Sequence, residues 1–203
     1  MPNGFDIEHF RPDETAREWL LAQLGLTHQA ALIGFVARFD PMKDHATFFR
    51  AASALAAKED SVHFILAGDG MVTSNAQVSM LLDSKIRDKV HLLGRREDIP
   101  RLLAAMDIAT SASAYGEGFS NAVGEAMACG VPCVVTDVGD AAWIVGDTGR
   151  VVPPGSPEGL TEAWERLLDM DRGERKRLGE KARARVAENF EINNVVRRFE
   201  DFY

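Results

Sequence analysis

The sequence contains little cysteine, no long apolar segment and no metal-binding pattern. The only two cysteines, Cys129 and Cys133, are separated by three residues, and the five histidines show no metal-ligand spacing. No apolar run approaches the roughly 18 residues that cross a bilayer, and residues 1–4 lack the regions of a signal peptide. These absences favour a cytoplasmic protein with two reduced, buried thiols and no bound metal.

Positive charge is also scarce. The 23 basic and 31 strongly acidic side chains give a formal net charge of −8, so the chain as a whole repels phosphate polymers. Nucleic acid is therefore not an expected partner. Residues 172–198 are a local exception, with an excess of Lys and Arg. A contact with a membrane surface would explain this stretch, but a solvated helix face is the commoner explanation.

Apolar residues occur in short runs that alternate with segments of helical period. This pattern predicts an α/β fold, a Rossmann-like open parallel sheet with helices on both faces. A length of 203 residues fits a single domain, residues 1–203. We expect strands at 32–37, 62–67, 90–93, 107–111 and 133–136, helices after Asp44 and over 99–105, and three helical stretches after residue 156. Such sheets bind ligands beyond the carboxyl ends of their strands.

Two basic residues follow the first predicted strand. Arg38 stands at the end of this strand and Lys43 directly before the next helix. The planar fork of an arginine and the compact charge of a lysine together suit the two negative charges of a nucleotide diphosphate. Two solvated surface cations would give the same pattern, and this segment alone does not decide between the two interpretations.

A loop and a predicted helix offer a second anion site. Gly118 allows close approach of the backbone, and Ser120 or Asn121 is placed to cap a helix whose first-turn N–H groups would bind a phosphate. Glu117 and Glu125 would weaken that attraction, so we expect them to accept hydroxyl groups of two sugars instead. A glutamate at the helix terminus and a solvated one would fit the spacing equally well.

The turn that follows the second predicted strand contains Gly68, Asp69 and Gly70. It lacks the third glycine and the downstream acidic residue of a dinucleotide fingerprint, so the sequence does not predict a nicotinamide or flavin cofactor. We interpret it as a tight turn at the crevice, where Gly68 and Asp69 would lie near a ligand.

These segments together resemble the C-terminal, donor-binding domain of retaining glycosyltransferases of family 4, which have the two-domain GT-B architecture. The resemblance covers nearly the whole chain and is carried by residues 3–12, 34–43, 65–70, 92–94 and 117–132. The last of these is the most specific, because Glu117 and Glu125 are separated by seven residues within the Gly-Phe and Glu-Ala-Met context of the family signature.

The resemblance implies a role for each candidate residue. Arg38 and Lys43 would bind the donor diphosphate, Glu117 the donor sugar, Glu125 the ribose, and Arg95 the nucleobase. The backbone of Phe119, Ser120 and Asn121 would contact the sugar and the phosphate, without a metal or other cofactor. Ser120 stands where the family often has glycine, and residues 138–140 replace a common double glycine, so the identity of the sugar stays open.

The reaction implied is transfer of a hexosyl group from a nucleotide diphosphate sugar to an acceptor hydroxyl, with retention at the anomeric carbon. The acceptor would be lipid-linked or a saccharide, in the synthesis of polysaccharide, lipopolysaccharide or glycolipid, with localisation in the cytoplasm or at the inner face of the membrane. An N-terminal acceptor domain would be a partner not included here, so we expect this chain alone to bind the donor but turn over little. The alternatives are a nucleotide-sugar epimerase or a phosphorylase of the same architecture, and a non-catalytic nucleotide-binding module.

Overall fold

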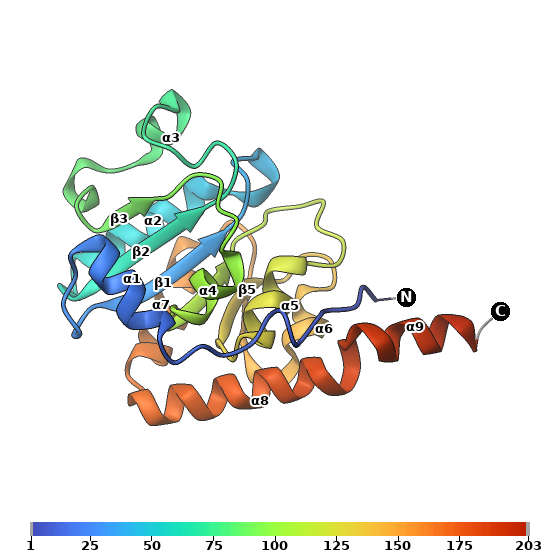
Figure 1. Cartoon of the computed structure of the whole chain (residues 1–203). Helices are drawn as coiled ribbons and strands as arrows, with labels where there is room; N and C mark the ends of the chain where they lie inside the picture. The colour runs from blue at the N-terminus through green and yellow to red at the C-terminus, as the bar shows by residue number, and fades with distance from the viewer. Residues whose placement is uncertain (1, 202–203) are drawn as a thin grey trace.

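The computed structural model describes residues 2–201 and is built around a six-stranded parallel sheet (Figure 1). The strands are β1 (Ala31–Val36), β2 (Val62–Ala67), β3 (Val90–Leu92), β4 (Ile108–Ser111), β5 (Cys133–Thr136) and β6 (Arg150–Val152). They lie in the order β3-β2-β1-β4-β5-β6, and every neighbouring pair is parallel. Strands β2 and β3 are therefore added on one side of β1, and β4 to β6 on the other. An open α/β sheet forms its ligand crevice at this switch point, between β1 and β4.

Helices cover both faces of this sheet. One hydrophobic cluster joins the sheet to α1 (Ala16–Leu24), α4 (Ile99–Ala104), α5 (Asn121–Ala128), α6 (Ala141–Val145) and α8 (Arg172–Phe190). The other joins it to α2 (His45–Ala56), α3 (Ala76–Leu81) and α7 (Pro157–Leu168). Figure 1 shows α8 running along one side of the domain and α9 (Ile192–Glu200) continuing beyond it.

The alternation of side chains along the strands explains why both faces are covered. In β2, Phe64 and Leu66 belong to the cluster beneath α2 and α7, whereas Ile65 and Ala67 belong to the opposite one. All four side chains are fully buried, so this strand has no solvated face. Its near-continuous apolar sequence is the pattern that parallel strands require, and it confirms the predicted fold class.

The five expected strands are confirmed, with ends that differ by one residue at most. The sixth strand, β6, was not expected, because it begins with the charged Arg150 and Val151 is exposed, which leaves little of an apolar run to detect. The three helices after residue 156 and the start of α5 at Asn121 agree with the prediction. Ser120 does occupy the N-cap position of α5, but its side chain makes no capping hydrogen bond, so that part of the expectation is wrong.

Much of the basic stretch at residues 172–198 is used inside the fold. Its arginines donate hydrogen bonds to backbone carbonyl groups. Three reach distant segments: Arg172 to His28, Arg183 to Ile7, Phe10 and Ala128, and Arg185 to Trp143 and Ile144. Arg175 instead binds the end of the preceding helix and the turn after it, at Leu167, Leu168 and Met170. The stretch is therefore not simply a solvated helix face. Within residues 2–201, no helix has both the length and the apolar character needed to span a bilayer.

Candidate functional site

Arg38 and the turn that follows it lie at the carboxyl end of β1. The Nε atom of Arg38 donates to the Asp40 carboxylate at 3.1 Å, and 62% of the Arg38 side chain is exposed. Asp40 also accepts from the backbone N–H of Met42 at 2.9 Å. That hydrogen bond, followed by the one from Arg38, lowers the pKa of Asp40. Arg38 therefore presents an accessible cation at the edge of the crevice.

Lys43 ends the same turn and points at the loop that follows β4. Its Nζ atom lies 2.5 Å from Oε2 of Glu117, and only 17% and 10% of the two side chains are exposed. The hydroxyl of Ser113 donates to the same carboxylate oxygen at 2.6 Å. The other oxygen, Oε1, accepts no side-chain hydrogen bond from residues 2–201. The two residues that were predicted to bind separate parts of a ligand are thus joined in one part-buried cluster.

The loop that carries Glu117 is fixed from several sides. Ser113 is 1% exposed, and its carbonyl accepts the hydroxyl of Thr136 at 2.7 Å. The N–H of Ala114 donates to the carbonyl of Met42 at 2.9 Å, which ties this loop directly to the turn before Lys43. The Lys43–Glu117 pair is therefore held by the backbone of both loops as well as by its own charge.

The loop continues into the amino end of α5. Gly118 is exposed and a side chain there would meet no atom within 4 Å, so the backbone is open to a ligand at this point. The ring of Phe119 packs instead on Phe5, with 5.6 Å between ring centroids. Asn121 is exposed, and its carbonyl oxygen accepts from the amide of Asn3 at 2.9 Å. The first turn of α5 thus has an accessible side next to Gly118 and a packed side beneath Phe119.

Glu125 lies one turn inside α5 and has different surroundings. It lines a hollow of about 470 Å³ together with Asn121, the N-terminal segment near Asn3 and Phe10, and Phe199 of α9. Burial raises the pKa of Glu125. Its carboxylate makes no ion pair with any residue from 2 to 201, so the described part of the chain does not neutralise it.

The other predicted binding residues lie at the carboxyl ends of β2 and β3. A Cβ atom at Gly68 would lie 2.0 Å from the carbonyl oxygen of Ala37, so only glycine allows this turn to press against the end of β1. The N–H of Gly68 also donates to Gly94 at 2.8 Å, next to Arg95. Asp69 and Arg95 both have exposed side chains. Three adjacent strand ends therefore form one continuous edge.

Sequence reasoning missed Ser113 and Thr136, which support Glu117. Ser113 comes two residues after β4 and Thr136 is the last residue of β5, so both stand at neighbouring strand ends. Their place at the carboxyl ends of buried strands was the signal that could have identified them, because buried hydroxyl groups at such ends need a partner. No cluster of three or more His, Cys, Asp or Glu side chains within residues 2–201 is arranged to hold a metal ion.

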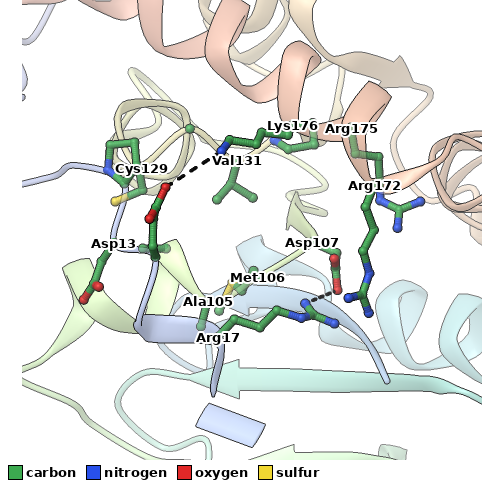
Figure 2. A pocket seen from close by; sticks show the side chains of 15 residues that line it. Asp13, Arg17, Ala105, Met106, Asp107, Cys129, Val131, Arg172, Arg175 and Lys176 are labelled. Atoms are coloured by element: carbon green, nitrogen blue, oxygen red, sulfur yellow. Dashed lines mark hydrogen bonds and ion pairs between the residues drawn. The ribbon is translucent and has the colours of Figure 1, made fainter. Parts of the chain in front are cut away.

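A second hollow, of about 420 Å³, lies at the opposite edge of the sheet (Figure 2). It is lined by Asp107 and Pro132, which directly precede β4 and β5, and by several cations. Arg17 pairs with Asp107 at 2.7 Å, and the same carboxylate oxygen accepts the N–H of Leu32 at 2.8 Å. The ion pair in this hollow therefore joins α1 to the amino end of the sheet, whereas Lys43 lies at the carboxyl end.

The comparison with known protein families agrees with this geometry. The model of the family described as glycosyl transferases group 1 matches residues 30–170, which include Arg38, Lys43, Glu117 and Glu125. The chain belongs to this family. It accordingly shares its ancestry with enzymes that transfer sugars.

Curated relatives match over most of this chain but only part of their own length. The D-inositol 3-phosphate glycosyltransferase of Mycobacterium tuberculosis is 32% identical over 200 residues, which are 95% of this chain and 40% of that protein. The UDP-Gal:alpha-D-GlcNAc-diphosphoundecaprenol alpha-1,3-galactosyltransferase of Escherichia coli is 32% identical over 141 residues, 68% of this chain and 36% of that protein. The chain thus spans well under two thirds of these relatives.

Solved glycosyltransferases of the GT-B architecture share the fold. The crystal structure of Anabaena Alr3699/HepE in complex with UDP and glucose superposes with a TM-score of 0.83 at 27% sequence identity. The match covers 98% of this chain and 55% of that one. The six-stranded sheet and its helices therefore correspond to about half of such an enzyme.

Proposed function

We propose that this chain is the donor-binding domain of a retaining glycosyltransferase of family 4. It binds a nucleotide diphosphate sugar beyond the carboxyl ends of β1 and β4 and supports transfer of a hexosyl group to an acceptor hydroxyl. The observation that carries the proposal is the part-buried pair of Lys43 and Glu117, beside the exposed Arg38 and the start of α5. A solved relative in complex with UDP and glucose supports this class of ligand.

The geometry of the pair explains how one cluster serves both parts of the donor. Lys43 uses one of its three N–H donors on Oε2 of Glu117, which leaves two for diphosphate oxygens. Glu117 receives Lys43 and Ser113 on Oε2 and keeps Oε1 for a sugar hydroxyl. The bond between sugar and diphosphate then lies across the pair, with the cation on the leaving group and the carboxylate on the sugar.

The remaining residues complete the donor site in this proposal. Arg38 binds the diphosphate from the exposed side, and the backbone N–H groups at Phe119, Ser120 and Asn121 approach it at the amino end of α5. Glu125 accepts the ribose hydroxyls. Arg95, with Gly68 and Asp69 on the neighbouring turn, borders the nucleobase.

Catalysis in this site is electrostatic. Negative charge develops on the departing diphosphate, and Arg38, Lys43 and the helix terminus stabilise it in preformed positions without requiring a metal ion. Removing one such preorganised donor typically lowers the rate by on the order of 100- to 1000-fold. Neither glutamate acts as the nucleophile. An acceptor domain outside this sequence supplies the acceptor, which is lipid-linked or a saccharide, and closes the crevice against water.

Calorimetric titration with UDP, GDP and ADP tests the proposal. We expect one nucleoside diphosphate to bind more tightly than the others, and Arg38→Ala to weaken its binding at least tenfold with little loss of stability, because Arg38 is exposed. The matched control is Lys58→Ala, which removes a cation of similar exposure from an ion pair with Glu165. Equal effects of the two substitutions on nucleotide affinity would contradict the proposed site.

A further inference from the structure

The start of α5 lacks the local contacts that usually fix the first turn of a helix. Its N-cap residue, Ser120, makes no side-chain capping hydrogen bond. The third helical residue is Val123, which has no side-chain acceptor and so cannot complete a capping box. The proposed function nevertheless places the backbone of this turn against the donor. The direction of its N–H groups therefore depends on contacts from outside the helix.

A hydrophobic staple is incomplete here as well. In this motif the apolar residue before the N-cap packs on the fourth residue of the helix. The first member is present as Phe119, but the fourth residue of α5 is Gly124, which has no side chain. The ring of Phe5 lies in the place of that side chain, because a Cβ atom at Gly124 would lie 2.0 Å from Cζ of Phe5. The same ring stacks on Phe119, with 5.6 Å between ring centroids and 27° between the ring planes.

Phe5 is held in place by the opposite end of the sequence. Its N–H donates to the carbonyl of Phe190 at 2.8 Å, and its own carbonyl accepts from the N–H of Ile192 at 3.0 Å. The side chain is 4% exposed. In Figure 1 the N-terminal segment accordingly passes between α5 and the junction of α8 and α9. The ring that completes the staple is thus anchored independently of α5.

We propose that Phe5 is a positioning residue for the donor site and acts as the distant member of this hydrophobic staple. By stacking on Phe119 it fixes the turn from Phe119 to Asn121, and with it the direction in which the N–H groups of that turn point. This inference rests on the proposed function, because its effect on binding requires the diphosphate to lie at this turn. A tilt of the turn would weaken several backbone hydrogen bonds to the ligand together.

Phe5→Leu tests the role of the stacked ring. The substitution keeps an apolar side chain but removes the ring from Phe119, and should weaken the preferred nucleoside diphosphate by about fivefold, the effect of losing one aromatic pair. Phe64→Leu is the matched control, because it removes a fully buried ring from the opposite hydrophobic cluster. Both variants should lose similar stability in urea unfolding, but only Phe5→Leu should bind more weakly. Equal nucleotide affinity of the two variants overturns the proposal.

A rescue experiment tests the staple itself. Phe5→Ala removes one member and should weaken nucleotide binding. Gly124→Leu should weaken it too, since the new side chain meets the ring of Phe5. The double variant places both members of the staple within the local sequence, and should bind the nucleotide more tightly than either single variant. A double variant that does not exceed both of them overturns the proposal.

Amide hydrogen exchange gives a measurement that needs no ligand. The N–H of Gly124 donates to the carbonyl of Ser120 at 3.4 Å, within the first turn of α5. This amide should exchange faster in Phe5→Leu than in Phe64→Leu or the unaltered protein, and an unchanged rate overturns the positioning role.

The outcomes also separate this inference from the proposed function. If the unaltered protein binds no nucleoside diphosphate, the proposed function fails and this inference fails with it. If Arg38→Ala weakens binding but Phe5→Leu does not, only the positioning role of Phe5 is overturned.

Discussion

Gly139 packs directly against the backbone of Glu117. A Cβ atom at Gly139 would lie 2.1 Å from the carbonyl oxygen of Glu117, and the φ angle of 58° at this glycine is itself unfavourable for any other residue. The loop after β5 therefore presses on the loop that carries the catalytic glutamate candidate. Asp140, the next residue, donates its N–H to the carbonyl of Gly118 at 3.1 Å.

The first prediction concerns Gly139→Ala. The substitution should displace the Glu117 loop and lower the free energy of unfolding by more than about 2 kcal/mol, since left-handed backbone strain and a clash add together. Nucleotide affinity should fall with it. Gly155→Ala is the matched control, because Gly155 has a φ of 68° but no atom within 4 Å of a new Cβ. Urea unfolding and calorimetry should show a loss of about 1 kcal/mol for the control and unchanged nucleotide binding.

The second prediction concerns the energy of the Lys43–Glu117 pair. Lys43→Met or Glu117→Gln alone leaves a part-buried group without its partner, and should lower the free energy of unfolding by about 2 kcal/mol, less than for a fully buried pair. The double variant should lose less than the sum of the two, with a coupling of about 1 to 3 kcal/mol in a double-mutant cycle measured by urea unfolding. Additive losses would mean that the two side chains do not interact in solution.

The third prediction assigns a positioning role to Ser113. Ser113→Ala removes the hydroxyl that holds the Glu117 carboxylate, so binding of a nucleotide sugar should weaken more than binding of the corresponding nucleoside diphosphate. Thr148→Ala removes another buried hydroxyl, which donates to Val145 at 2.7 Å, and serves as the control. Both variants should lose about 1 to 2 kcal/mol of stability. If the ratio of the two affinities is the same in both variants, Ser113 has only a structural role.

The fourth prediction concerns stability at acid pH. Burial lowers the pKa of His45 and of His91 to about 4, and both values lie below the value of 6.5 expected in the unfolded chain. Because the unfolded state then binds protons more readily, the stability that these groups contribute is complete above about pH 6.5 and is lost as the pH falls through 4. For the buried His45 the loss is on the order of 3 kcal/mol. The free energy of unfolding of His45→Phe should therefore fall less steeply than that of the unaltered protein as the pH is lowered from 6.5 to 4. An unchanged dependence on pH would disprove the assignment.

The fifth prediction concerns Arg183, which joins the N-terminal segment to the end of α5. Its guanidinium donates to the carbonyls of Ile7 and Phe10, each at 3.0 Å, and to that of Ala128. Arg183→Lys should lower the free energy of unfolding by about 2 kcal/mol, because an ammonium group does not span the same three acceptors. The exposed Arg177 on the same helix gives the control, and Arg177→Lys should change stability by less than about 0.5 kcal/mol.

The two longest strands, β1 and β2, were predictable because each is a mainly apolar run whose central residues are buried on both sides. In β1 and β2, six residues of sequence are enough to show this apolar run. The start of α5 is marked by the polar residues that precede its apolar face. Strand β6 was missed because only Val152 of its three residues is buried, so its sequence does not show the apolar run of a buried strand.

The residues of the candidate site were predictable, but the contacts between them were not. Lys43 and Glu117 are 74 positions apart in the sequence, and their pairing depends on how the loops after β1 and β4 meet. The roles of the arginines in α8 are equally non-local, because Arg183 contacts carbonyls more than 170 residues away. A charge count along one helix carries no information about such acceptors.

The pairing of Phe5 with the junction of α8 and α9 has a consequence for synthesis on the ribosome. The N–H of Phe5 donates to Phe190 at 2.8 Å, and its carbonyl accepts from Ile192 at 3.0 Å. Both phenylalanines belong to the same buried cluster. At roughly 5 to 20 residues per second, Phe5 waits roughly 10 to 40 s for its partner to be translated. Until then the apolar surface that packs on the end of α8 is left uncovered, and we expect a chaperone to act on it.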